Sequence, residues 1–360
     1  MSDMALPTRP EQITAGWLTE AFDFRFPGTR VTDARIEDVI RGTSTKIRVR
    51  AQYDANGQRY GLPATFIVKG GFEDHSVRMK ALYHREMRFY RDIQPFVTLP
   101  SPICYYAGRD PAPDAYQSLI IIEDLKRDGV EFCHALRPQR FEQVARRLDA
   151  MARYHVELWD SDAFRPGGRF EWVEKNLVSD ASVEYIDYYM APQRWRHFIE
   201  SPRGAAVSVR LHDGERLRDG LRSLARFHEN HPRTLLDGDT HLGNLYIQPD
   251  GSPGFFDMMV NQAPWFHEVT YHIICALDIA DRAAWERPLL MHYLDCLRAH
   301  GLENPPGFEE AFECYRRDIV WGLFVFLINE TNFQTEAINT AYAARFGDAA
   351  IAHGTMQLLR

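Results

Sequence analysis

Three side chains in one stretch of the chain, Asp239, Asn244 and Asp257, have the chemistry that phosphoryl transfer needs. The reaction requires a carboxylate that orients the attacking hydroxyl and oxygen ligands that hold Mg²⁺ against the phosphates. Carboxylate and amide oxygens are ligands that Mg²⁺ accepts. The intervening residues 245–254 read as a strand, a Pro-Asp-Gly turn and a second strand. We therefore expect a hairpin that returns Asn244 and Asp257 to the same end of a small sheet.

A candidate phosphate-binding turn lies between two strands predicted within residues 36–53. The second strand alternates as a half-exposed antiparallel strand does, with apolar residues at every second position: Ile47, Val49, Ala51 and Tyr53. The turn before it carries one glycine followed by small hydroxyl residues: Gly42, Thr43, Ser44 and Thr45. Backbone amides and hydroxyls of such a turn can face phosphate oxygens. Taken alone, however, the segment favours an ordinary hairpin turn with a polar tip.

Lys69 and Glu86 are expected to form a buried ion pair. Lys69 ends the largely apolar strand 64–69, and Glu86 lies on the apolar face of a helix predicted over residues 75–93. That face is formed by Met79, Tyr83, Tyr90 and Ile93. A buried ammonium is costly unless a carboxylate meets it, and such a pair holds the nucleotide phosphates in kinases. The alternative is two unrelated charges whose stems are buried while their ends reach solvent.

The chain is expected to divide near residue 125 into an N-lobe of residues 1–124 and a C-lobe of residues 125–360. Residues 118–122 read as an apolar strand at the edge of the sheet, and an extended crossing follows from Glu123 to Leu125. The backbone of this crossing is expected to bind the edge of an adenine ring.

Helical periodicity dominates after the crossing. Helices are predicted to start at Phe141 and to cover residues 216–228, 265–276, 288–300 and 308–332. The first of these helices places His155 on its buried face. We interpret His155 as a hydrogen-bonded structural histidine rather than a catalytic one.

The composition is that of an ordinary soluble globular protein, with 45% hydrophobic and 26% charged residues. A net charge of −8 without a basic run argues against nucleic acid or an anionic membrane as a partner. The five cysteines are widely spaced and form no Cys-x-x-Cys pair, which indicates neither a disulfide framework nor a zinc site. No secretory signal or membrane-spanning apolar run is visible, so a cytoplasmic location is expected.

Together these residues resemble the aminoglycoside phosphotransferase superfamily, the small-molecule branch of the protein-kinase-like fold. The likeness is strongest to bacterial phosphotransferases allied to the choline-kinase-like and ecdysteroid-kinase-like groups. The family's loop, His-Gly-Asp-x-His-x-Gly-Asn, stands here at residues 237–244 as Asp-Gly-Asp-Thr-His-Leu-Gly-Asn. The resemblance covers nearly the whole chain and implies an α+β fold of two lobes. The N-lobe would be an antiparallel sheet plus a helix, and the C-lobe would be mainly helical.

The resemblance also implies a role for each candidate residue. Asp239 is expected to act as the base or to orient the hydroxyl. Asn244 and Asp257 are expected to bind Mg²⁺, and Lys69, held by Glu86, to bind the α- and β-phosphates of ATP.

Four positions in or after the loop either support it or depart from the family's pattern. His241 is interpreted as a support for the loop, with proton transfer as the alternative. Asp237 replaces the family's first loop histidine and places a second carboxylate near Asp239, although it could instead pair with an arginine and anchor the loop. Met258 replaces the usual aromatic after the metal-binding aspartate, and Met259 a frequent glutamine. The two methionines bear on rate and substrate choice rather than on the chemistry.

We therefore expect an enzyme that transfers the γ-phosphoryl group of ATP, or of GTP, to a hydroxyl of a small molecule with the help of Mg²⁺. The aromatic-rich segments 185–195 and 321–332 are expected to wall the acceptor site, with Tyr188 and Trp321 against a largely uncharged, hydrophobic or aromatic alcohol. One alternative is an aminoglycoside or choline-type acceptor. Another is a nucleotide-binding pseudokinase with a regulatory role.

Overall fold

The computed structural model describes residues 4–126, 129–137 and 139–359, which fall into two units. The first comprises the described residues of Met1–Val97, Ser101–Val130 and Phe256–Met259, and the second those of Thr98–Pro100, Glu131–Phe255 and Val260–Arg360. The lobe boundary expected near residue 125 stays a prediction. No described helix has both the length and the apolar character needed to cross a bilayer.

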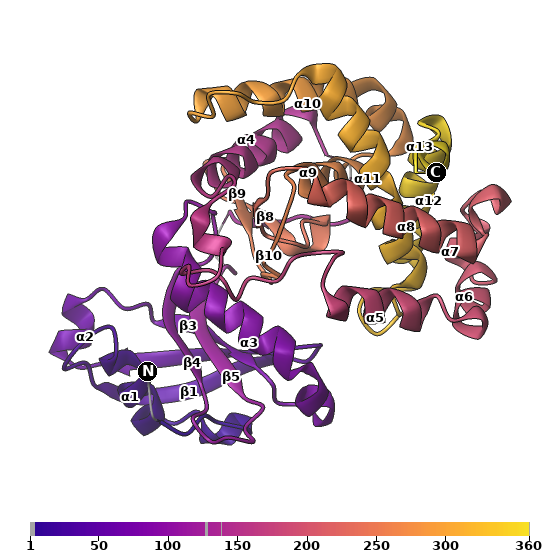
Figure 1. Cartoon of the computed structure of the whole chain (residues 1–360). Helices are drawn as coiled ribbons and strands as arrows, with labels where there is room; N and C mark the ends of the chain where they lie inside the picture. The colour runs from indigo at the N-terminus through magenta and orange to yellow at the C-terminus, as the bar shows by residue number, and fades with distance from the viewer. Residues whose placement is uncertain (1–3, 127–128, 138, 360) are drawn as a thin grey trace. The chain divides into compact units, whose positions relative to one another are not determined.

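A five-stranded antiparallel sheet forms the first unit in the order β1-β2-β3-β5-β4 (Figure 1). The strands are β1 (Val31–Ile40), β2 (Thr45–Tyr53), β3 (Thr65–Gly70), β4 (Cys104–Arg109) and β5 (Ser118–Glu123). The apolar positions predicted on β2 are buried and alternate with more exposed ones, which confirms the predicted period. The prediction that residues 118–122 form an edge strand is wrong. β5 lies between β3 and β4, where neighbours on both edges and covered faces bury its apolar run.

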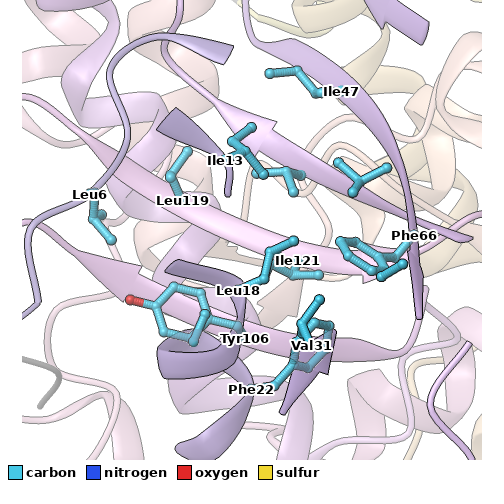
Figure 2. Close-up of a cluster of buried hydrophobic side chains, with 14 of the residues drawn as sticks. Leu6, Ile13, Leu18, Phe22, Val31, Ile47, Phe66, Tyr106, Leu119 and Ile121 are labelled. Carbon is cyan, nitrogen blue, oxygen red and sulfur yellow. The ribbon is translucent and has the colours of Figure 1, made fainter. Parts of the chain in front are cut away.

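The core of this unit lies between the sheet and α1 (Ala15–Asp23), and the short α2 (Ala55–Arg59) follows β2. Figure 2 shows Leu18 and Phe22 of α1 beside Phe66 of β3. The rings of Phe22 and Phe66 meet edge to face with centroids 5.3 Å apart. Because side chains alternate along a strand, Lys69 of β3 points to the face opposite Phe66.

The single helix predicted over residues 75–93 is wrong in detail. The segment consists of a 3₁₀ helix (Asp74–Met79), α3 (Lys80–Arg88) and a π-helical turn (Phe89–Ile93). At its start the Ser76 hydroxyl accepts the backbone N–H of Glu73 at 3.0 Å, as part of a capping box that begins the helical segment. Most of the predicted apolar face is nevertheless buried: Tyr83, Glu86, Tyr90 and Ile93.

Helices dominate the second unit. They are α4 (Phe141–Glu157), α5 (Asp180–Tyr189), α6 (Pro192–Ile199), α7 (Pro202–Ala205), α8 (Gly214–Glu229), α9 (Phe266–Ala276), α10 (Ile279–Ala299), α11 (Phe308–Ile328), α12 (Glu336–Ala352) and α13 (Thr355–Leu358). Two small antiparallel sheets contain β6 (Glu131–Phe132), β7 (Thr234–Leu236), β8 (Leu245–Ile247), β9 (Pro253–Phe255) and β10 (Asn261–Ala263). Their orders are β6-β8-β9 and β10-β7.

The hairpin predicted after Asn244 is present. β8 and β9 pair antiparallel with Leu245 opposite Phe255. In the turn between them Gly251 adopts a φ of 82°, a conformation that glycine takes without strain.

The helix predicted to start at Pro288 begins instead at Ile279. Asp278 caps it by accepting the backbone N–H of Asp281 at 2.9 Å. Pro288 lies inside α10, although a proline has no N–H and normally ends a helix. α10 packs along α4 (Figure 1), and tertiary packing of this kind supplies most of a helix's stability. The helix predicted over residues 308–332 is α11, which ends at Ile328 rather than at residue 332.

Candidate active site

Lys69 joins two carboxylates in the first unit. Its ammonium donates to Oε1 of Glu86 and to Oδ1 of Asp257, each at 2.5 Å. Lys69 and Glu86 are buried, whereas the Asp257 side chain keeps 30% of its surface exposed. The predicted Lys69–Glu86 pair is present, and Asp257 shares its cation.

The charges of this cluster support one another against burial. Burial lowers the pKa of Lys69, but Asp257 and Glu86 raise it above its ordinary value. Burial raises the pKa of Asp257, but Lys69 and then Lys46 lower it below its ordinary value. For Glu86, burial raises the pKa above its ordinary value in spite of Lys69. Of the two carboxylates beside Lys69, Asp257 is therefore the more strongly held in its ionised form and Glu86 the less.

Lys46 is a second cation at Asp257, and the sequence argument assigned it no role. Its Nζ lies 3.3 Å from Oδ2 of Asp257. Lys46 and Lys69 are direct partners in the β2–β3 register, so both side chains lie on one face of the sheet. Like charges opposite each other repel, and the carboxylate between them relieves the repulsion. The available signal was one lysine in the turn before a predicted strand and another at the end of the next predicted strand, but the strand register decides whether the two face each other.

The backbone at Asp257 is unusual. Its φ of 61° is uncommon for a residue with a side chain. The contacts with Lys46 and Lys69 hold the carboxylate in place, and such backbone strain persists only where the surroundings fix it. The next residue, Met258, is fully buried.

The candidate phosphate turn is tied to the segment that precedes α3. Thr45 is buried at the start of β2, and its hydroxyl donates to Oε1 of Glu73 at 2.9 Å. The backbone carbonyl of Thr43 accepts from the Tyr83 hydroxyl at 2.5 Å. Gly42 is exposed and Ser44 is half-buried. Contact of this turn with phosphate stays a prediction.

The crossing from Glu123 to Leu125 is fixed by its middle residue. The carboxylate of Asp124 accepts from Nε of Arg48 at 2.8 Å and from Nη2 at 3.2 Å. Leu125 is buried, and Glu123 ends β5. Adenine binding by this backbone stays a prediction.

Asp239 lies in the second unit, in the loop after β7. Nδ2 of Asn244 donates to its Oδ2 at 3.1 Å, and the Tyr271 hydroxyl donates to its Oδ1 at 3.0 Å. Nε2 of His241 lies 3.5 Å from the same Oδ2, and 33% of the Asp239 side chain is exposed. The carboxylate is thus fixed on one side and open on the other. Because Asn244 directs its amide nitrogen at Asp239, its amide oxygen remains for another ligand.

The start of the loop is anchored by its own backbone. Asp237 is buried and accepts the backbone N–H of Asp239 at 3.1 Å. Gly238 adopts a φ of 91°, which favours glycine, and its N–H donates to Oε1 of Glu268 at 3.0 Å. Asp237 thus anchors the loop through the backbone.

Three residues on one face of α9 hold the loop, and sequence reasoning gave them no role. Glu268 accepts the N–H at position 238, Tyr271 donates to Asp239, and Nδ1 of His272 donates to the carbonyl of Thr240 at 3.0 Å. They occupy positions i, i+3 and i+4 of a helix whose residues are all buried. Polar residues at that spacing in an apolar helix were the signal available.

His155 supports the same network from α4. It is fully buried, with Nε2 at 2.8 Å from Oε2 of Glu268 and Nδ1 at 2.7 Å from the Tyr293 hydroxyl. This confirms its interpretation as a structural histidine.

Tyr188 and Trp321, which were predicted to line the site of the acceptor substrate, belong to one group of aromatic side chains in the second unit. Their two rings, both in the described part of the chain, are not in direct contact with each other. Tyr188 on α5 is 52% exposed, and its ring packs against Tyr189 at 5.0 Å. Trp321 on α11 packs against Phe324 at 5.9 Å. Tyr185 joins the two sides, since its ring lies 4.9 Å from that of Tyr189 and 6.1 Å from that of Phe324.

The donor set suits the expected metal and nucleotide. Asp257 offers a half-exposed carboxylate and Asn244 an amide oxygen, which are hard ligands of the kind Mg²⁺ takes. A second cluster, His228, His267 and Asp318, brings its ligand atoms within 4.8 Å of one another. There the Asp318 carboxylate accepts a hydrogen bond from each histidine, at 2.7 and 2.9 Å. All three residues are buried, and the cluster lies in the core of the second unit.

Comparison with known proteins supports the fold. No family model matches the chain, and no curated protein matches its sequence. Among solved structures, Plasmodium vivax ethanolamine kinase matches with a TM-score of 0.50 and 13% identity, over 88% of this chain and 81% of that one. The GDP and kanamycin complex of APH(2″)-IIia matches with a TM-score of 0.50 and 10% identity, over 86% and 89% of the two chains. Choline kinase LicA from Streptococcus pneumoniae reaches 0.48 with 10% identity, over 94% and 98%. The two matches with a TM-score of 0.50 show that the chain has a two-lobed, kinase-like α+β fold, which confirms the fold implied by its resemblance to the aminoglycoside phosphotransferase superfamily.

Proposed function

We propose that the protein is a small-molecule kinase that transfers the γ-phosphoryl group of ATP to an alcohol. The observation that carries this proposal is the Lys69 ammonium shared between Glu86 and Asp257. A buried lysine held by one carboxylate can meet the nucleotide phosphates, and a half-exposed carboxylate beside it can bind their metal ion. A purely structural ion pair would need only one of the two acids.

The nucleotide side of the reaction belongs to the first unit. Lys69 and the turn at residues 42–45 would bind the phosphates, Lys46 would add a second positive charge, and the crossing at residues 123–125 would hold the adenine. Asp257 would hold Mg²⁺, and Asn244 of the second unit would supply a further oxygen ligand; the ion neutralises charge on the β- and γ-phosphates when bound.

The acceptor side belongs to the second unit. Asp239 would accept a hydrogen bond from the acceptor hydroxyl and orient its oxygen toward the γ-phosphorus. The new bond joins that oxygen to phosphorus, the bond to the β,γ-bridging oxygen breaks, and the hydroxyl proton passes to Asp239 or to solvent. The products are ADP and a phosphate monoester.

We propose that the acceptor is a largely uncharged, hydrophobic or aromatic alcohol. Tyr185 and Tyr188 expose 43% and 52% of their surfaces on α5, which leaves apolar ring surface for a ligand body. Burial raises the pKa of the Tyr185 hydroxyl, and the charges of Tyr189, Asp239 and Glu330 raise it further. The guanidinium of Arg194 already stacks on Tyr188 at 3.6 Å from the ring centroid. That face of the ring is therefore closed to a ligand ammonium.

Space for a ligand body is available beside these rings. A cavity of about 630 Å³ opens in the second unit between α6–α7 and the connection that joins α11 to α12. Its lining includes Arg194, His197, Phe198, Glu330 and Thr331. Arg194 thus belongs both to the cavity and to the aromatic group, so an acceptor body could extend from one to the other.

A screen of alcohols with Mg·ATP tests the proposal, with ³¹P NMR used to detect phosphate monoester. We expect aryl or steroid-like alcohols to be phosphorylated, and Asp239→Asn to lower turnover by about 10²–10⁴-fold while ATP still binds. Turnover of only choline, ethanolamine or kanamycin would overturn the acceptor class but not the reaction. Mg·ATP binding without turnover of any alcohol would favour a pseudokinase, and failure to bind Mg·ATP would overturn the proposal altogether.

A further inference from the structure

Gln334 and His241 meet beside Asp239 in an arrangement that fixes the protonation of the histidine ring. Nδ1 of His241 accepts the backbone N–H of Gly243 at 2.9 Å, so Nδ1 carries no proton. The neutral ring must then carry its proton on Nε2. Nε2 faces the side-chain amide of Gln334 at 2.9 Å and Oδ2 of Asp239 at 3.5 Å.

The amide of Gln334 can therefore be oriented from the hydrogen bonds alone. With its nitrogen toward Nε2, two donors would face each other, and Oε1 of Gln334 would stay buried without a partner. Oxygen and nitrogen of a glutamine amide are assigned from such networks. Turning the amide by 180° places Oε1 at 2.9 Å from the Nε2–H group as an acceptor and removes the conflict. In that orientation Gln334 accepts the hydrogen bond that His241 would otherwise direct at Asp239.

Gln334 is held firmly enough to do this. It lies in the connection between Asn329 and Thr335, whose two ends are joined by the buried Asn339. Nδ2 of Asn339 donates to the backbone carbonyls of Asn329 and Gln334, each at 3.1 Å. Nδ2 of Asn329 donates in return to Oδ1 of Asn339 at 2.8 Å. Every hydrogen-bonding atom of the Asn339 amide is used to fix the connection.

We propose that Gln334 is a positioning residue for the proposed reaction: it draws the Nε2–H of His241 away from Asp239 and keeps Oδ2 free for the acceptor hydroxyl. Oδ1 of Asp239 already accepts from Tyr271 and Oδ2 from Asn244. A donation from His241 to Oδ2 would be the third protein hydrogen bond to this carboxylate. It would compete with the substrate for the remaining lone pair of Oδ2 and weaken the carboxylate as a base. The expected effect on kcat rests on the proposed function, whereas the expected position of the proton on His241 does not.

The test is a double-mutant cycle. Gln334→Met keeps the length of the side chain and removes the acceptor, so we expect kcat to fall about tenfold with KM for ATP unchanged. His241→Asn keeps an oxygen that can accept the N–H of Gly243 and removes the Nε2–H group. In that background Gln334→Met should change kcat by less than about twofold, because the two residues act as one unit. Gln357→Met, at an exposed position of α13, is the matched control and should leave kcat unchanged.

A second readout needs no turnover. In protein labelled with ¹⁵N-histidine, NMR should show His241 in the neutral form with its proton on Nε2. Gln334→Met should shift the Nε2-bound proton signal, and Gln357→Met should not. Equal costs of Gln334→Met in both backgrounds would overturn the proposal, and so would a proton on Nδ1 in the wild type. If no alcohol is phosphorylated at all, the NMR result still decides whether Gln334 holds the ring. If Gln334→Met does not fold, the wild-type spectrum still decides where the proton lies.

Discussion

At the scale of single residues, the candidate site consists of charges that depend on one another. Lys69 is buried between Glu86 and Asp257, and Lys46 meets Asp257 from the neighbouring strand. The chemistry of strand 64–69 and of the helix after it was enough to predict the Lys69–Glu86 pair. Lys46 could not be predicted in the same way, because its place opposite Lys69 depends on a register that turn residues alone do not define.

Breaking the Lys69–Glu86 pair from one side should be costly. Lys69→Met leaves Glu86 buried without its cation, and we expect the free energy of unfolding to fall by about 3–5 kcal/mol. Lys69→Met combined with Glu86→Gln should cost less than the sum of the single changes, as measured by urea denaturation. The half-exposed pair Arg50–Glu37 on the same sheet is the matched control. Its removal should cost much less, because solvent screens an exposed ion pair. Strict additivity at Lys69 and Glu86 would show that the two charges do not depend on each other.

At the scale of elements, α9 fixes the loop that carries Asp239. Its residues are all buried, yet Glu268, Tyr271 and His272 lie on one face and bond to three successive loop residues. The helix itself was predictable from its apolar run. Which of its polar residues face the loop was not, because that depends on how the helix is rotated against β7 and the loop.

The burial of His272 should make the second unit sensitive to acid. Burial lowers the pKa of His272 from 6.5 to about 3, so the ring stays neutral in the folded chain while the unfolded chain takes up a proton below pH 6.5. The free energy of unfolding should therefore fall as the pH drops from about 6.5 toward 3, by up to about 1.4 kcal/mol per pH unit for one proton. His272→Asn keeps a donor for the Thr240 carbonyl and removes the titration, so urea denaturation should show a shallower fall. The exposed His197→Asn should leave the slope unchanged. A His272→Asn slope equal to that of the wild type would contradict this account.

Two errors of element prediction have a common physical cause. Pro288 removes a backbone donor, and the sequence argument placed a helix start there, yet the Asp278 cap and packing against α4 carry α10 through it. The run at residues 118–122 is apolar at consecutive positions, which marks an interior strand, yet it was assigned to an edge because β4 was not recognised. In both cases contacts with other elements decide the outcome: packing against α4 keeps Pro288 inside a helix, and pairing with β3 and β4 places residues 118–122 inside the sheet.

At the scale of the whole molecule, the candidate residues are divided between the two units. Asp239 and Asn244 belong to the second unit, whereas residues 256–259 belong to the first although both flanking segments belong to the second. The order of motifs along the chain was enough to predict the kinase-like fold. The placement of Phe256–Met259 in the first unit was not predicted, although Asp257 makes ion pairs there with Lys46 and Lys69.

This placement leads to a prediction about nucleotide binding. If Mg·ATP binds through Lys69 and Asp257, it should slow the hydrogen exchange of backbone amides in three places: the segment 256–259, β3 and the turn at residues 42–45. The amides there would then exchange only after the ligand dissociates. At a hundredfold excess over the dissociation constant, the added stability should be about 2.7 kcal/mol. Asp257→Asn should remove this protection from the segment, from β3 and from the turn. Asp239→Asn should leave it intact, because in the proposed reaction Asp239 acts on the acceptor. Protection of the turn without protection of the segment would show that Asp257 closes a hairpin but does not bind the metal.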